Sequence, residues 1–120
     1  MRFGKVGRGS IIFKPIRLIN PQYVFIGEQV YLYKQARIEA VQKWGGRLYS
    51  PQIVIGNRVS FEQRLHLICA KTVSIGDNTI FSADVMITDI NHSYREINRR
   101  VMDQPLEVHE THIGKNCFVG

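Results

Sequence analysis

The sequence predicts an all-β fold, a left-handed parallel β-helix of about three and a half coils with two loop excursions. Two observations predict it. Large apolar residues recur at six-residue spacing, as in Ile75, Phe81 and Ile87. Three segments share the form apolar-x-Ile-Gly and mark the starts of three coils at Val24, Ile53 and Val73. A helix repeats at about 3.6 residues and a half-buried strand at about 2, so a six-residue spacing indicates short strands joined by tight corners.

Parallel stacking accounts for the composition of these segments. Each strand of such a coil pairs with the same side of the coils above and below it, at about 4.8 Å, so inward apolar residues form columns. A glycine follows the inward isoleucine at four predicted corners: Gly27, Gly56, Gly76 and Gly114. Without a Cβ, these corners avoid steric clashes. No segment shows the periodicity of an amphipathic helix.

The chain then divides in order into one domain over residues 1–120 with four special segments. Residues 1–23 carry five cations and no acid, and they are expected to form a basic cap over the first coil. Turn-forming residues predict a loop over 42–52, and the repeat breaks again over 89–110. Residues 113–120 begin a further coil that is cut short, so either the sequence is a fragment, or a second polypeptide or another subunit is expected to cover the open edge.

Composition narrows the class of protein only slightly. A chain of 120 residues with 44% hydrophobic and 22% charged residues is ordinary for one globular domain. No long apolar run or secretory signal is evident, which predicts a cytoplasmic chain without a transmembrane segment. The net charge of +6 suits an anionic partner such as a nucleotide-bearing cofactor, a phospholipid surface or nucleic acid. Cys69 and Cys117, without a C-x-x-C motif, predict two reduced thiols.

His92 is the candidate catalytic residue. It lies in the second loop, in the segment Thr88-Asp-Ile-Asn-His-Ser-Tyr. A histidine can remove a proton at neutral pH, and loops on a rigid scaffold are common sites of function. Asp84, Asp89 and Glu96 are the carboxylates near it in the sequence.

The repeats, this loop segment, the later Gln104-Pro-Leu and the restart Ile113-Gly-Lys-Asn-Cys-Phe-Val-Gly together resemble the hexapeptide-repeat O-acetyltransferases. The branch they resemble most includes maltose and galactoside acetyltransferases and the acetyltransferases of bacterial surface-polysaccharide synthesis. The similarity extends from about Gly9 to the end of the sequence. The repeat by itself also occurs in other acyltransferases and in γ-class carbonic anhydrases.

The resemblance implies transfer of an acetyl group from acetyl-CoA, as co-substrate, to a hydroxyl of a sugar or surface-polysaccharide precursor. It implies that His92 is the general base and that no metal takes part. Substrate contacts are expected at four residues: Asp84, where the family usually has Asn, and Asp89, Asn91 and Tyr94. Cofactor contacts are expected at Phe118 and Gly120. Family members continue for several more coils that hold the pantetheine arm, so this sequence is expected to carry only the beginning of that groove.

The resemblance also implies a homotrimer with the active site between subunits and no nucleic-acid partner, while the basic N-terminal segment leaves contact with a membrane surface open. Two other functions stay open. The chain could be a catalytically silent β-helix that serves as an assembly or binding module. It could also be a γ-carbonic anhydrase-like enzyme with zinc on His66, His92 and His112, although the His-x4-His pair of those enzymes is missing.

Overall fold

The computed structural model describes residues 2–92, 100 and 106–120. In this part of the chain the structure is all-β, with three parallel sheets, two short antiparallel hairpins and no α-helix. The first sheet has the strand order β1 (Lys5–Val6), β4 (Val24–Ile26), β9 (Gln52–Ile55), β12 (Thr72–Ile75) and β17 (Thr111–Ile113). The second has the order β18 (Phe118–Val119), β13 (Ile80–Phe81), β10 (Ser60–Phe61), β5 (Tyr31–Leu32) and β2 (Ile11–Ile12). The third has the order β14 (Met86–Thr88), β11 (His66–Cys69), β6 (Ala36–Ala40) and β3 (Ile16–Ile19).

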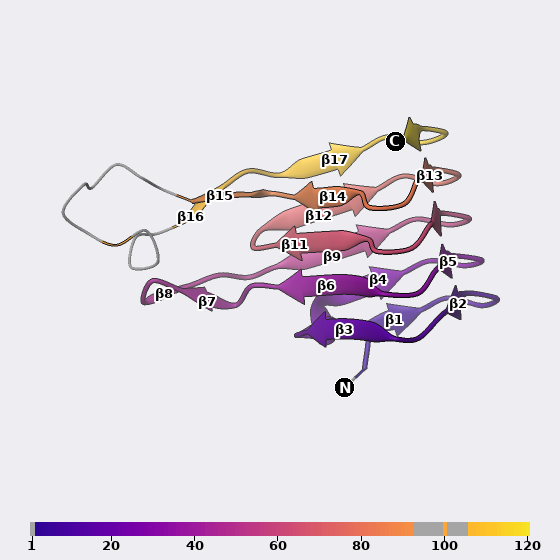
Figure 1. Cartoon of the computed structure of the whole chain (residues 1–120). Helices are drawn as coiled ribbons and strands as arrows, with labels where there is room; N and C mark the ends of the chain where they lie inside the picture. Colours follow the sequence, from indigo (N-terminus) through magenta and orange to yellow (C-terminus); the bar gives the residue numbers. More distant parts are fainter. Residues whose placement is uncertain (1, 93–99, 101–105) are drawn as a thin grey trace.

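The chain visits the three sheets in rotation. Each circuit places one strand in the first, second and third sheet in turn, and the next circuit stacks on it, as Figure 1 shows. The stacking is in register: Ile26, Ile55, Ile75 and Ile113 are successive Cα partners across four strands of the first sheet. The expected all-β class with parallel strand pairing is therefore confirmed.

The core consists of the inward columns of the three sheets. In the second sheet Leu32, Phe61 and Phe81 are completely buried, and the rings of Phe61 and Phe81 stack with centroids 4.7 Å apart. In the third sheet Ile38, Leu67 and Ile87 are Cα partners with no more than 5% exposure. Burying large apolar side chains contributes about 1.5–3 kcal/mol each, so these columns are the main source of stability.

Close approach of stacked backbones explains the corner glycines. A Cβ on Gly76 would lie 2.7 Å from the carbonyl carbon of Gly114 and from the amide nitrogen of Lys115. Left-handed backbone is found instead at non-glycine corner residues in two groups: Gln29, Arg58, Asn78 and Asn116, and Gln35, Arg64 and Asp84. The glycines therefore provide space for the next circuit, and the neighbouring residues adopt the positive φ values.

The N-terminal segment contributes one strand to each of the three sheets. Residues 1–23 contain β1, β2 and β3, which are the outermost strands of the three sheets, followed by the 3-10 turn Pro21–Tyr23. Apolar side chains hidden among the cations, such as Ile12, Ile16 and Leu18, pack against the buried core. The repeat thus begins before Val24, and the cations lie on its outward face.

Two hairpins interrupt the stack where the third sheet connects to the first. In the predicted 42–52 loop, β7 (Lys43–Trp44) pairs with β8 (Arg47–Leu48). In the predicted 89–110 loop, β15 (Ile90–His92) pairs with β16 (Leu106–Val108). Both hairpins project from the same side of the molecule, on the left in Figure 1.

Candidate functional site

An apolar groove lies on the outer face of the third sheet, beside the two hairpins. Its volume is about 200 Å³, and six apolar side chains line it: Val41, Trp44, Ile68, Met86, Ile90 and Leu106. Glu39 and Thr88 supply its polar lining. Strand alternation accounts for this face, because the residues that flank the buried Leu67 and Ile87 must point outward. Met86 is 58% exposed there, so it contributes apolar surface to this outer face.

A second groove, more polar, adjoins the first. It has a volume of about 490 Å³ and shares Glu39, Val41 and Trp44 with the apolar groove. Its other linings include two cations, Arg37 and Lys43, and two amides, Asn20 and Gln42. We call it the basic groove. Trp44, from the first hairpin, thus borders both spaces.

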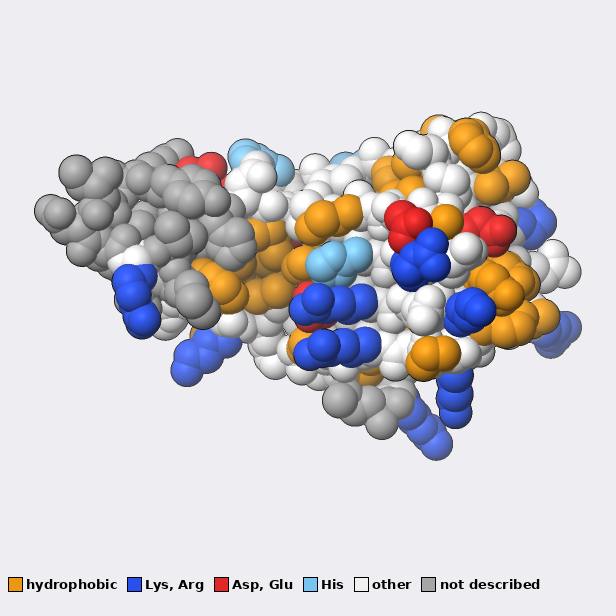
Figure 2. Space-filling model, viewed as in Figure 1, with side chains coloured by type: hydrophobic (Ala, Val, Ile, Leu, Met, Phe, Trp, Pro, Cys, Tyr) orange, Lys and Arg blue, Asp and Glu red, His pale blue; other side chains and the backbone are white. Residues whose placement is uncertain are grey.

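Cations are stacked along the third sheet next to these grooves. Arg17 and Arg37 are Cα partners on β3 and β6, and His66 is the partner of Arg37 on β11. Figure 2 shows Lys, Arg and His side chains gathered on this face next to hydrophobic side chains. Like charges on directly opposed residues destabilise a sheet. This arrangement therefore costs stability unless an anion lies nearby.

Glu39 partly compensates this charge. Its Oε1 accepts hydrogen bonds from Nε and Nη2 of Arg37 at 3.0 and 2.8 Å. Its Oε2 lies 3.6 Å from Nε2 of His66, and the Glu39 side chain is only 12% exposed. Within the described part of the chain, this imidazole nitrogen has no hydrogen-bond partner although it is shielded from solvent. His66 and Glu39 thus form a potential ion pair at the edge of the grooves.

The backbone of His92 lies at the base of the second hairpin. His92 is the last residue of β15 and the Cα partner of Leu106, which lines the apolar groove. The amide of Leu106 donates a hydrogen bond to the Tyr49 hydroxyl at 2.9 Å, which links the second hairpin to the end of the first excursion. The side chain of His92 and the whole of Tyr94 lie outside the described residues.

Asp84 lies at the other end of β14 from this hairpin. It adopts φ of 61° at the corner between β13 and β14, and its side chain is 59% exposed. Nη2 of Arg64 donates to its Oδ2 at 2.9 Å, and this hydrogen bond lowers the pKa of the Asp84 carboxyl. Asp84 is not among the residues that line either groove, and β14 separates it from Asp89.

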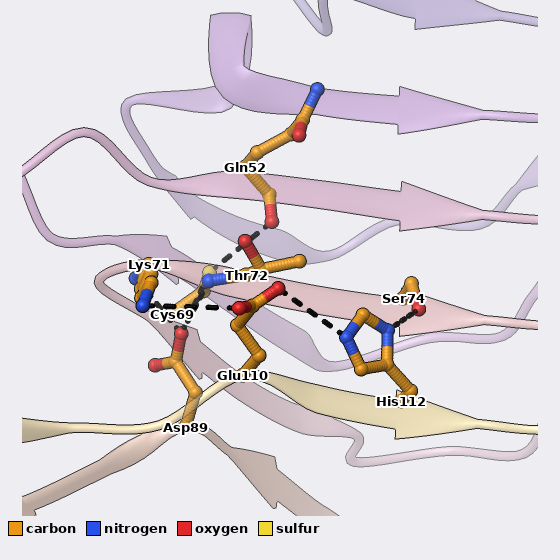
Figure 3. A network of polar contacts seen from close by, with 8 residues as sticks. All are labelled: Gln52, Cys69, Lys71, Thr72, Ser74, Asp89, Glu110 and His112. Atoms are coloured by element: carbon orange, nitrogen blue, oxygen red, sulfur yellow. Dashed lines mark hydrogen bonds and ion pairs between the residues drawn. The ribbon is translucent and has the colours of Figure 1, made fainter.

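Asp89 is buried, in contrast to the substrate contact expected from the sequence. It is 3% exposed, and its carboxylate accepts backbone N–H groups of Ala70, Lys71 and Thr72 at 2.9, 2.8 and 2.7 Å. Ala70 and Lys71 form the corner between β11 and β12, and Thr72 is the first residue of β12 (Figure 3). Burial and the Asp89 charge raise the pKa of the neighbouring Cys69 thiol to about 12. The geometry therefore favours a structural role for Asp89. Its carboxylate holds the start of the 89–110 segment against the corner of the preceding circuit.

The remaining expected contacts fall on separate surfaces. Asn91 is exposed on β15 opposite Glu107. Phe118 is 74% exposed in the second sheet, where its Cα partner Ile80 is 49% exposed. A Cβ on Gly120 would lie 3.3 Å from the Phe118 ring, so these two residues are adjacent. They belong to a different sheet from the grooves.

A polar network on the first sheet was not predicted. Nδ1 of His112 is hydrogen-bonded to the Ser74 hydroxyl, and its Nε2 lies 3.5 Å from Glu110, which in turn lies 3.8 Å from Lys71 (Figure 3). These ionisable side chains are more than half exposed, so the ion pairs contribute little to stability.

Two of the histidines considered as zinc ligands lie in different sheets, His112 in the first and His66 in the third. Among the residues that the structure describes, no group of three or more His, Cys, Asp or Glu side chains is placed to hold a metal ion.

Comparison of the chain with protein-family models, with curated proteins and with solved structures finds no match. Within the described ranges, none of the structure's helices has the length and apolarity to cross a membrane.

The groove residues were not singled out from the sequence. The available signal was the pair Ile68 and Met86, which are apolar although they neighbour inward Leu67 and Ile87 and must therefore face outward.

Proposed function

We propose that the chain is a left-handed parallel β-helix that transfers an acetyl group from acetyl-CoA to a hydroxyl of a sugar or surface-polysaccharide precursor. His92 is the general base, and the acceptor lies in the grooves beside its hairpin. Phe118 and Gly120 contact the cofactor, and the enzyme acts as a homotrimer with the active site between subunits. The resemblance of the sequence to the hexapeptide-repeat O-acetyltransferases is the source of these assignments.

One observation supports the proposal above the others. The register of β15 and β16 sets His92 opposite Leu106, and Leu106 lines the apolar groove. A general base must come within hydrogen-bond reach of the hydroxyl that it deprotonates. The backbone of His92 lies beside this groove, and this position supports its assignment as the base.

In the proposed reaction His92 removes the proton of the acceptor hydroxyl while the oxygen attacks the thioester carbonyl carbon. The resulting tetrahedral intermediate collapses with cleavage of the carbon–sulfur bond, and the protonated His92 returns the proton to the CoA thiolate. The products are the acetyl ester and CoA thiol. No covalent acyl-enzyme forms, so the reaction requires both substrates to be bound together.

Release of CoA thiol tests the proposal. The protein is incubated with acetyl-CoA and a panel of sugars and sugar phosphates, and His92→Ala and His109→Ala are compared with the wild type. His109 is an exposed histidine near the other end of the same excursion, so it serves as the matched control. Loss of a positioned general base lowers the rate by about 100-fold or more. Equal rates in the wild type and His92→Ala would instead favour a catalytically silent binding module.

A further inference from the structure

We infer that the adjoining grooves on the third sheet bind a phosphate-bearing sugar, with the phosphate in the basic groove at Arg37 and Lys43, the neighbouring Arg17 adding positive charge, and the sugar ring against Trp44. The inference rests on the proposed function, because it names the chemical class of the acceptor. It does not depend on the transfer chemistry, because binding can be measured without acetyl-CoA.

The positive charge on the outer face of the third sheet favours binding of an anion. Arg17 and Arg37 are opposed in register on neighbouring strands, and Lys43 lines the same groove as Arg37. Arg37 also lines a third space of about 340 Å³ together with Arg17, so Arg37 borders both the basic groove and the space beside Arg17. Within the described ranges, neither Arg17 nor Lys43 has a carboxylate within ion-pair distance. Among the described residues that line the grooves, Glu39 is the only carboxylate, and it already accepts hydrogen bonds from Arg37.

Phosphate fits this arrangement better than an isolated carboxylate. A phosphate group offers several acceptor oxygens and up to two negative charges, which can be shared by more than one cation. Arg37 uses Nε and Nη2 for Glu39, and its Nη1 remains as a donor on a side chain that is 46% exposed. The basic groove, at about 490 Å³, is within the size range of small-molecule sites.

The rest of the lining suits a sugar ring. Trp44 borders both grooves, and the C–H face of a pyranose can pack on an aromatic ring. Asn20 and Gln42 direct their amide N–H groups to the Ala40 carbonyl and the Tyr23 hydroxyl at 2.9 and 2.8 Å. Their side-chain oxygens are therefore left as acceptors for sugar hydroxyls.

The position of Trp44 connects this site to the proposed chemistry. A sugar ring on Trp44 with its phosphate in the basic groove has its other side toward the apolar groove. That groove ends at Ile90 and Leu106 of the second hairpin, which carries His92. A sugar bound there would therefore lie beside the hairpin whose strand β15 ends at His92.

Trp44 is the single tryptophan of the sequence, so its fluorescence reports on the grooves directly. The probes are glucose 1-phosphate, glucose, inorganic phosphate and phosphatidylglycerol vesicles, each titrated into the full chain. Glucose 1-phosphate is expected to change Trp44 fluorescence and to bind at least 10-fold more tightly than glucose or inorganic phosphate. Equal affinity for glucose 1-phosphate and either of its parts would overturn the inference, as would a response to vesicles with none to the sugar phosphate.

Charge-removing variants locate the site. Arg37→Gln and Lys43→Gln are each expected to raise the Kd for glucose 1-phosphate at least 10-fold, while Lys34→Gln leaves it unchanged. Lys34 lies 5.7 Å from the Tyr33 ring and is not among the groove linings, so it controls for net charge. Lys43 is exposed on a two-residue strand, so its variant keeps the test valid even if Arg37→Gln unfolds. Wild-type affinity in Lys43→Gln and in a folded Arg37→Gln would refute the site. Binding without CoA release would refute the transfer reaction alone.

Discussion

Oδ2 of Asp89 lies 3.4 Å from Sγ of Cys69 in the buried corner between β11 and β12. Burial and this carboxylate raise the pKa of the Cys69 thiol to about 12, so about one molecule in ten thousand carries the thiolate at pH 8. Cys117 is only half-buried. A disulfide exchange reagent at pH 8 is therefore expected to modify one thiol per native chain and two in urea. Rapid modification of both thiols in the native chain would contradict this buried geometry.

The same carboxylate predicts a stability effect. Asp89→Ala leaves three backbone N–H groups of the corner without their acceptor, and a buried unsatisfied donor costs about 1–3 kcal/mol. Urea denaturation is expected to show a loss of at least about 2 kcal/mol in the free energy of unfolding. Asp89→Asn retains one oxygen acceptor and is expected to fall between the wild type and Asp89→Ala. A substrate contact without a structural role would leave the unfolding curve unchanged.

Two corner glycines provide a matched test of backbone stacking. Gly76→Ala places a Cβ 2.7 Å from backbone atoms of the next circuit, whereas Gly114→Ala meets nothing closer than 3.8 Å. Neither glycine has a positive φ, so the two differ mainly in the circuit that stacks on them. Thermal unfolding is expected to show Gly76→Ala strongly destabilised, by about 2 kcal/mol or more, and Gly114→Ala within about 0.5 kcal/mol of the wild type. Similar losses in both would show that conformational freedom, rather than space, is required.

The opposed arginines predict a gain in stability. Arg17→Gln removes one of two like charges that face each other on β3 and β6. The expected gain is about 0.2–1 kcal/mol at low ionic strength, and it should disappear in high salt because the side chains are exposed. Thermal unfolding at two salt concentrations measures it. A loss of stability at low salt would indicate that Arg17 has an attractive partner instead.

The Arg64–Asp84 pair predicts a shift in titration. The hydrogen bond from Arg64 keeps the pKa of Asp84 below its ordinary value of 3.8. This pKa is lower in the folded chain than in the unfolded one. The pair's contribution to folding stability is therefore fully present above the unfolded value of 3.8. It is lost as the pH falls through the lowered pKa. Carboxyl NMR is expected to show the Asp84 midpoint rising toward 3.8 in Arg64→Gln. Arg58→Gln, whose guanidinium binds Asn78, should leave it unchanged.

The sequence was informative where one periodicity governed the structure. The apolar-x-Ile-Gly segments predicted the parallel strands and their corners, because each residue of these segments has the same environment in every circuit. The same pattern failed before Val24. There, Ile12, Ile16 and Leu18 lie among cations and glycines, so the sequence does not reveal that they pack against the core.

The candidate site was less predictable because it depends on outward residues from distant segments. Glu39, Ile68 and Met86 meet only because their strands stack, and Trp44 reaches them through a hairpin whose direction no local pattern specifies. Asp89 is a case in which position in the sequence and contacts in the structure favour different roles. Its position near His92 in the sequence favoured a substrate contact, whereas its carboxylate binds the backbone of the circuit below.

The hairpins β7–β8 and β15–β16 leave the stack at equivalent corners, and the corner between them is closed by only Ala70 and Lys71. The strands on either side nevertheless keep their register, as Ile53 shows by pairing with both Val24 and Val73. The length of the connection between the third and first sheets therefore does not affect the register of the strands. Connections of different length can therefore replace one another at this edge. Grafting the short Ala70-Lys71 connection in place of residues 41–51 would remove Trp44 and one wall of the grooves and leave the strand register unchanged.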